Sequence, residues 1–221
     1  KIIGSMKTNA GFFSNDKGHI ELFCNRMISD IKQLNLLGSW CDTNEYMIKN
    51  MLSNVEKVAL ITLDPYWSSN PWTRGLEGKR VLVIHPFADL IEQQYKENRT
   101  KLFKNPDVLP EFELHTIQAV QSLGGETHGF NDWFEALNWM EDKMDECDYD
   151  IVLIGCGAYG FPLAAHAKRM GKKAVHLGGA LQLLFGIKGK RWENPEYGAI
   201  RLKRKNAYPE LFNEYWIRPD E

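Results

Sequence analysis

The pattern of apolar and polar positions differs between the N-terminal part of the chain and the rest. From His19 to Leu37 apolar residues recur at three- and four-residue steps, which predicts an amphipathic helix. A shorter helix is expected near Glu45 to Leu52. Beyond this point short, continuous apolar runs alternate with amphipathic stretches. The pattern therefore predicts extra N-terminal helices followed by a region of alternating strands and helices.

Five apolar runs predict buried strands, at residues 58–63, 80–84, 113–119, 150–154 and 173–177. Helices are expected between them, at about 89–103, from a cap at Asn131 to 147, at 162–170 before Gly171, and at 180–185. Continuous apolar strands alternating with helices indicate a parallel sheet covered on both faces. We predict a single α/β domain over residues 1–221 with a Rossmann-like, mostly parallel sheet of about five strands. Its parts would be a helical segment (about 1–55), the core (about 56–192) and an irregular tail (about 193–221).

Composition and charge narrow the class of protein. The 221 residues are 43% hydrophobic and 25% charged with a net charge of −2, so no nucleic-acid partner is expected. The longest apolar runs fall far short of the roughly 20 residues that span a bilayer, so no membrane span is expected. The four cysteines form no CxxC pair. We therefore expect no structural zinc, a reducing compartment and a cytoplasmic location.

The sequence Gly155-Cys156-Gly157-Ala158-Tyr159-Gly160 matches the pattern G-x-G-x-x-G. It follows an expected strand and precedes an expected helix. Such a turn presents backbone N–H groups and a helix N-terminus to an anionic oxygen, usually of a phosphate. The alternative is a tight turn that packs strand against helix without a ligand.

A second glycine turn, Gly178-Gly179, ends the next expected strand and precedes Gln182 and the basic sequence Lys188-Gly189-Lys190-Arg191-Trp192. Residues 188–205 carry seven basic and two acidic side chains, a local charge of +5. The two turns would open on the same edge of the sheet, where the basic residues could neutralise a diphosphate. Residues 132–150, with eight acidic side chains and one lysine, are expected to be a solvated helix face.

An NAD cofactor fits this arrangement less well. It requires an acidic residue at the end of the strand after the glycine turn, where this chain has Gly178-Gly179. The glycine pattern also follows the fourth expected strand rather than the first. An NAD(P)-dependent oxidoreductase therefore stays as the alternative.

His85 and Asp64 end two of the expected strands, where parallel strands face a ligand crevice. His85 could bind a phosphate or a hydroxyl, or could instead be a capping residue. Asp64 could be a general base, or a turn residue before Pro65. Trp67 and Trp192, in expected loops, could stack on a sugar or base, or simply pack.

The run from Ile154 to Trp192 (IGCGAYGFPLAAHAKRMGKKAVHLGGALQLLFGIKGKRW), with VLVIHPF and NAGFF earlier in the chain, resembles proteins encoded in bacterial and viral surface-polysaccharide gene clusters. Those proteins are grouped with the GT-D-type, Rossmann-like glycosyltransferases. The resemblance covers about residues 9–216. It implies a nucleotide-sugar donor and a glycan acceptor, with Asn9, Phe12 and Phe13 closing over the site. The Asp-x-Glu motif through which that family holds a divalent metal has no counterpart at a strand end here.

These observations predict transfer of a sugar from a nucleotide-diphosphate donor. The donor crevice would be lined by Gly155, Gly157, Tyr159, Gly160, Gly178, Gly179 and Gln182. Lys188, Lys190 and Arg191 would stabilise the leaving diphosphate by fixed positive charge. A divalent metal would add to this charge, but no ligand set for it is found. A non-catalytic protein that binds a nucleotide or a glycan is a further alternative.

Overall fold

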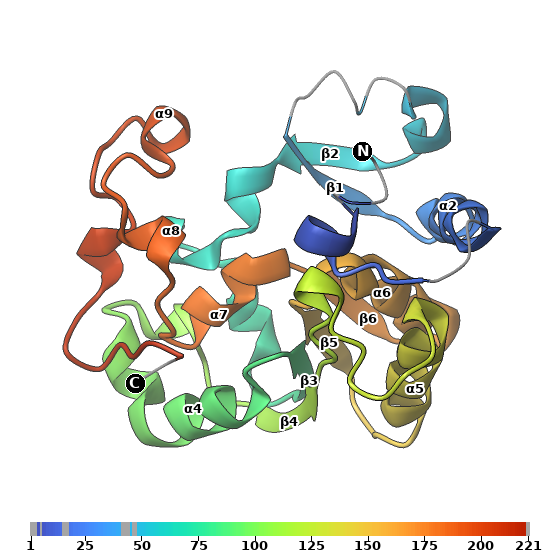
Figure 1. Ribbon diagram of the computed structural model, residues 1–221. Coiled ribbons are helices and arrows are strands. Elements are labelled where there is room, and N and C mark those ends of the chain that lie inside the picture. Colours follow the sequence, from blue (N-terminus) through green and yellow to red (C-terminus); the bar gives the residue numbers. More distant parts are fainter. Residues whose placement is uncertain (1–3, 5, 15–17, 41–44, 46–47, 220–221) are drawn as a thin grey trace.

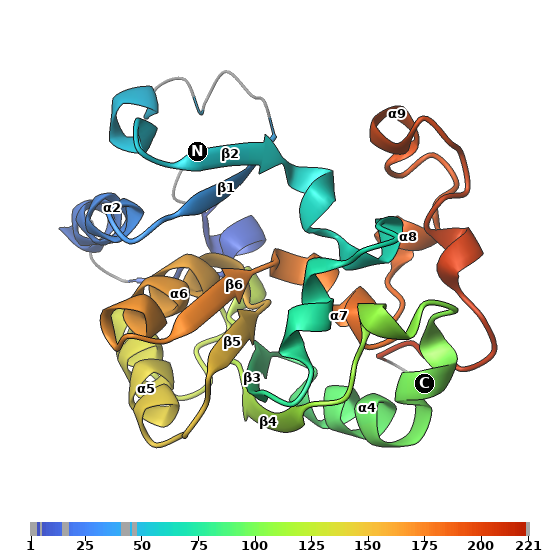
Figure 2. The ribbon, with the colours of Figure 1, turned by 180° about the vertical axis from the view of Figure 1, so that it is seen from behind.

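Helices and two parallel sheets make up the protein, seen in a computed structural model that describes residues 4, 6–14, 18–40, 45 and 48–219 (Figures 1 and 2). The helices are α2 (Gly18–Ile31), α4 (Ala88–Leu102), α5 (Trp133–Asp145), α6 (Gly160–Arg169), α7 (Leu181–Leu184), α8 (Lys190–Glu193) and α9 (Ala199–Leu202). The strands are β1 (Leu36–Ser39), β2 (Glu56–Ala59), β3 (Arg80–His85), β4 (Glu113–Gln118), β5 (Ile151–Ile154) and β6 (Lys173–His176). The α/β class and the parallel pairing are confirmed.

The larger sheet has four parallel strands in the order β4-β3-β5-β6. Val81 of β3 pairs with Leu114 of β4 on one side and with Ile151 of β5 on the other. After β3 the chain thus adds β4 on one side of it, and then returns to add β5 on the other side. The direction in which successive strands are added to the sheet therefore reverses between β3 and β5. Open α/β sheets bind ligands at the carboxyl ends of the strands at such a point.

Apolar side chains fill both faces of this sheet. Leu82 and Ile84 of β3 join a core with α5 and α6, whereas Val81 and Val83 join a second core with α4 and α7. Residues 81–84 of β3 are all fully buried, because successive side chains point to opposite faces and both faces are covered. Figure 1 shows α5 and α6 on one side of the sheet and α4 on the other. The prediction of helices on both faces is therefore confirmed.

The strand predicted at residues 58–63 is corrected. It forms strand only up to Ala59, in a separate two-stranded parallel sheet with β1, and residues Leu60–Leu63 turn into a 3-10 helix. Gly38 of β1 explains the packing, because the side chains of Leu60 and Leu63 occupy the space where its Cβ would lie. The main sheet consequently has four strands rather than about five.

Two boundaries near the N-terminal helices also differ from prediction. The helix expected from His19 to Leu37 ends at Ile31, and the last part of that stretch becomes β1. Part of the helix expected near Glu45 to Leu52 lies outside the described residues, and Lys49–Leu52 form a 3-10 helix. Helix α5 is capped by Asp132 rather than Asn131, since its carboxylate accepts from the N–H groups of Phe134 and Glu135.

The expected irregular tail contains short helices and packs on the second core. Trp216 is 3% exposed, and Ile217 forms a parallel β-bridge with Ile187. The Gln94 side chain of α4 donates to the carbonyls of Gly186 and Tyr215, which links the tail to the main sheet's helices. Within the described part of the chain, no helix is both long enough and apolar enough to cross a membrane.

Candidate functional site

The carboxyl edge of the main sheet brings together most of the groups singled out in the sequence. Gly155 follows β5 and donates its N–H to the Ile84 carbonyl of β3 at 2.9 Å. A Cβ placed on Gly155 would lie 2.6 Å from the Gly178 carbonyl oxygen and 2.8 Å from Cδ2 of His85. The ends of β3, β5 and β6 therefore meet at one point beside the reversal between β3 and β5.

The first glycine turn leads from β5 into α6 through a 3-10 helix (Gly157–Tyr159). Gly157 is exposed and has φ of 58°, a conformation that favours glycine. A Cβ on Gly160 would overlap the imidazole of His176 on β6, so this glycine allows α6 to lie close to the sheet. The turn leaves a bare backbone at Gly157 and uses Gly155 and Gly160 for packing.

Tyr159 and the N-terminal aromatics are core residues. The Tyr159 ring is 1% exposed and stacks on Trp133 at 4.9 Å between ring centroids. Phe12 and Phe13 are 3% and 5% exposed and belong to the same core. Their burial anchors the N-terminal segment; the resemblance had suggested that these rings close over a site.

Ser122 fixes the N-terminal segment against the first glycine turn, and nothing in the sequence pointed to it. Its buried hydroxyl donates to the Gly11 carbonyl at 2.5 Å and lies 2.8 Å from the Tyr159 hydroxyl. Residues Met6–Ala10 form a single π-helical turn, and the Ala10 carbonyl oxygen would lie 3.3 Å from a Cβ on Gly157. The Asn9 backbone belongs to this turn, and its side chain lies outside the described part of the structure.

His85 lies at the end of β3 with 2% of its surface exposed. Its Nδ1 accepts a hydrogen bond from the backbone N–H of Phe87 at 3.0 Å. Pro86 has no N–H, so Phe87 supplies the first backbone donor after the strand. Burial lowers the pKa of His85 to about 4, so the imidazole is neutral near pH 7.

The second glycine turn carries the basic residues. Arg191 lies next to it, because a Cβ on Gly179 would be 2.8 Å from Arg191 Nη2. The guanidinium is stacked over Trp192, with Cζ 4.4 Å from the ring centroid, and Trp192 itself is 3% exposed. The Gln182 side chain donates to the Lys188 carbonyl at 2.8 Å and so holds the connection between the glycine turn and the basic residues.

Three basic side chains near this turn have no ionic partner among the described residues. Other basic side chains of the tail form ion pairs, such as Lys205 with Glu196 and Arg204 with Glu210. Among the described residues Lys188, Lys190 and Arg191 form none. A concentration of uncompensated positive charge next to bare backbone favours an anionic ligand.

Asp64 and Trp67 belong to a different part of the molecule, because β2 is not in the main sheet. Asp64 lies between two 3-10 helices and accepts from the Tyr208 hydroxyl at 3.0 Å. Burial outweighs this hydrogen bond and raises the pKa of Asp64 to about 6. Trp67 packs edge-on against Tyr208, with ring centroids 5.2 Å apart. The two residues thus form an aromatic cluster with Tyr208 of the tail.

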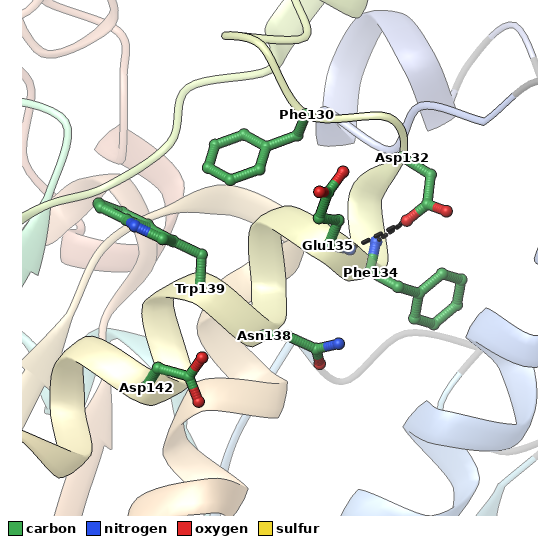
Figure 3. Close-up of a pocket in the computed structure, with 7 residues that line it drawn as sticks. All are labelled: Phe130, Asp132, Phe134, Glu135, Asn138, Trp139 and Asp142. Atoms are coloured by element: carbon green, nitrogen blue, oxygen red, sulfur yellow. Dashed lines mark hydrogen bonds between the residues drawn. The ribbon is translucent and has the colours of Figure 1, made fainter.

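A surface hollow of about 450 Å³ lies along the outer face of α5 (Figure 3). Its lining residues are Phe130, Asp132, Phe134, Glu135, Asn138, Trp139 and Asp142. Three of them are carboxylates and none is a cation, so the hollow would repel a diphosphate. Asp132 caps the helix and Glu135 accepts from the backbone N–H of Asn131, which gives both carboxylates a structural role. The carboxyl edge of the main sheet is the better candidate for an anionic ligand.

The metal implied by the resemblance does not fit the residues present. Among the described residues no group of three or more His, Cys, Asp or Glu side chains could hold a metal ion. At the carboxyl edge, His85 ends β3 while Gly155 and Gly178 follow β5 and β6, and none of the three is a carboxylate. We therefore derive no step through a metal.

Comparison with protein families, curated proteins and solved structures finds no match to this chain.

Proposed function

We propose that the protein is a glycosyltransferase that takes a sugar from a nucleotide-diphosphate donor and passes it to a glycan acceptor. The fold would then be a four-stranded variant of the Rossmann-like sheet. One observation carries the proposal: the two glycine turns meet where the order of strands reverses, next to Lys188, Lys190 and Arg191, which form no ion pair among the described residues. The resemblance supplies the sugar and the acceptor.

Different residues at the carboxyl edge would contact different parts of the bound diphosphate. The exposed backbone at Gly157 approaches the diphosphate, as in other phosphate-binding turns between strand and helix. Arg191, held over Trp192 beside Gly179, offers donors in a planar fork that suits phosphate oxygens. Lys188 and Lys190 add positive charge close by.

The reaction breaks the bond between the anomeric carbon and the diphosphate oxygen. The acceptor hydroxyl oxygen forms the new bond to that carbon, and the hydroxyl proton is released. The electron pair of the broken bond stays with the nucleoside diphosphate, which gains negative charge as it leaves. Lys188, Lys190 and Arg191 would stabilise this charge in the transition state. The described contacts of Asp64 lie in the aromatic cluster, so we do not assign it as the base.

A binding and turnover experiment tests this proposal. The protein is screened by thermal shift with UDP, GDP, CMP, dTDP, NAD and NADP, each with and without Mg²⁺ or Mn²⁺. A nucleotide present at 100 times its Kd stabilises the folded state by about 2.7 kcal/mol, a readily measured shift. We expect one nucleoside diphosphate to bind and its sugar conjugate to be hydrolysed slowly or transferred.

The variant Lys190→Ala/Arg191→Ala should weaken that binding at least tenfold, because it removes charge-assisted contacts. The double substitution Lys96→Ala/Lys104→Ala is the matched control. It removes the same charge from exposed residues of α4 and the loop that follows, away from the glycine turns. Equal affinity of the two double variants for the nucleoside diphosphate would contradict the proposal. Binding without turnover would identify a non-catalytic binding protein, and a shift with NAD alone would identify an oxidoreductase.

A further inference from the structure

His85 is held in one orientation and one tautomer at the meeting point of the strands. Its Nδ1 accepts from the Phe87 N–H, so that nitrogen carries no proton. The ring is neutral at pH 7, since burial lowers its pKa to about 4. A neutral imidazole has a single proton, which must then be on Nε2. His85 is thus a fixed N–H donor that does not change with pH in the physiological range.

The N–H on Nε2 has no acceptor in the described part of the chain, where Nδ1 makes the one hydrogen bond of this side chain. His85 Nε2 is not one of the fully buried side-chain atoms that lack a partner in the described part of the chain, so it is accessible to solvent. The neighbouring ring atom Cδ2 points at the junction of the two glycine turns, 2.8 Å from where a Cβ of Gly155 would be. Nε2 is bonded to Cδ2, so the free donor lies beside this junction.

We infer that His85 Nε2–H donates a hydrogen bond to an anionic oxygen of the bound ligand, as a neutral positioning group between the two glycine turns. The ligand class is a diphosphate, so the inference rests on the proposed function and adds a specific residue to it. A phosphate oxygen supplies the acceptor that this N–H lacks among the described residues. Lys188, Lys190 and Arg191 would attract the anionic ligand by their charge, while the hydrogen bond from His85 would fix its orientation.

Histidine suits this position better than a cationic side chain. A lysine or arginine at the end of β3 would bring a charge into a site that is 2% exposed, where desolvation is expensive. The neutral imidazole avoids that cost in the free protein. The local sequence His-Pro-Phe sets the tautomer, because the proline leaves the Phe87 N–H as the nearest partner for Nδ1.

The first test needs no ligand. Long-range proton–nitrogen NMR spectra of the histidine-labelled protein report which ring nitrogen is protonated, and the His85 signals are assigned by their loss in His85→Gln. We expect the Nε2–H form at every pH from 5 to 8. An Nδ1–H form, or a titration in this range, overturns the inference whatever the protein binds.

The second test measures the affinity for inorganic pyrophosphate by calorimetry. His85→Leu should bind roughly tenfold to a hundredfold more weakly than wild type, as expected for a lost hydrogen bond to a charged group. His85→Gln, which restores a side-chain N–H, should stay within a few-fold of wild type. His115→Leu, on the exposed part of β4, is the control and should leave the affinity unchanged. Addition of pyrophosphate should also shift the Nε2–H signal of the wild type.

The outcomes separate the two proposals. If wild type binds pyrophosphate, Lys190→Ala/Arg191→Ala weakens binding, and a folded His85→Leu does not, the inference about His85 fails and the proposed function stands. If wild type binds neither pyrophosphate nor any nucleoside diphosphate, the proposed function fails and the inference fails with it. Circular dichroism of each variant establishes that it is folded, and the ligand-free NMR measurement on wild type does not depend on any substitution.

Discussion

Individual residues of the glycine turn have distinct physical roles, although they share one motif. Gly155 has no side chain because the Gly178 carbonyl and the His85 ring occupy that space. Gly157 has a positive φ, and Gly160 allows α6 to approach His176. Substitutions at these positions should therefore affect the protein for different physical reasons. A substitution at Gly160 tests the packing role alone.

Gly160→Ala is expected to destabilise the protein by about 1–3 kcal/mol, the usual cost of overpacking a core. Helix propensity alone predicts the opposite sign, since alanine is favoured over glycine within helices. The overlap with the His176 ring decides the result. Urea unfolding measures it, with Gly75→Ala as the control, because no atom lies within 4 Å of a Cβ at Gly75. Equal stability of both variants and wild type would mean that α6 can move away from β6 at little cost.

Asp64 should make stability depend on pH in an unusual direction. Its pKa is about 6 in the folded protein, against an ordinary value of 3.8, because burial disfavours the charged form. Between these two values the folded state binds the extra proton, so the free energy of unfolding falls as pH rises from 4 to 6. The loss is up to about 3 kcal/mol and persists above pH 6.

Asp64→Asn tests this dependence, since the amide stays neutral and its oxygen still accepts from Tyr208. Urea unfolding is measured for both proteins at pH 4, 5, 6 and 7. The free energy of unfolding of the variant should increase relative to that of wild type as the pH rises. A difference that is constant with pH would show that folding leaves the pKa of Asp64 unchanged, and one that changes in favour of wild type would show that the folded protein stabilises the carboxylate.

At the scale of elements, the sequence predicts those whose burial comes from continuous or periodic apolar positions. The runs of β3 and β5 are buried from both faces, and α4 ends near its predicted boundary. The run 58–63 misleads because a short apolar segment suits a strand or a helical turn equally. Its partner is Gly38 of β1, and the sequence around Gly38 continues the apolar period of α2.

The sequence also predicts which strand-end residues of the candidate site lie together, but not the residues that reach the site from elsewhere in the chain. Residues at strand ends, such as His85, Gly155 and Gly178, converge because parallel strands share an edge. Asp64 does not join them, since its strand pairs elsewhere. Ser122 joins the site region through Gly11 and Tyr159, and no local pattern marks a serine that contacts residues so distant in the sequence.

The attachment of α2 depends on a buried carboxylate. Asp30 is 0% exposed and pairs with Arg26 of its own helix at 2.8 Å and with Arg169 of α6. Arg26 also pairs with Glu141 of α5 at 2.5 Å. The network joins three helices, and its one fully buried member is an acid on the polar side of the α2 pattern.

Asp30→Asn should destabilise the protein by about 2–3 kcal/mol, below the 3–5 kcal/mol typical of a broken buried pair. The smaller cost is expected because Arg26 and Arg169 both reach solvent, at 24% and 36% side-chain exposure. Chemical denaturation gives the total, and hydrogen exchange should show the largest loss of protection in α2. Lys205→Ala, which breaks an exposed pair with Glu196, should leave stability unchanged. A similar result for both variants would mean that packing alone attaches α2.

For the molecule as a whole, the two cores share the same strands. Alternate residues of β3 and β5 point into the core with α5 and α6 or into the core with α4 and the tail. Loss of either core would expose half of each central strand to water. The N-terminal Phe12 and the C-terminal Trp216 lie in different cores and are each 3% exposed.

This arrangement predicts one cooperative unfolding transition, as the single-domain organisation inferred from the sequence requires. Fluorine NMR of protein labelled with fluorotryptophan resolves the two cores, since Trp133 reports on one and Trp216 on the other. Both native signals should disappear at the same urea concentration, and far-UV circular dichroism should change with them. If Trp216 lost its native signal first, the tail and α4 would form a separately stable unit. The basic residues near Gly179 could then detach from the sheet edge without unfolding the rest, and the anion site would form only in part of the native population.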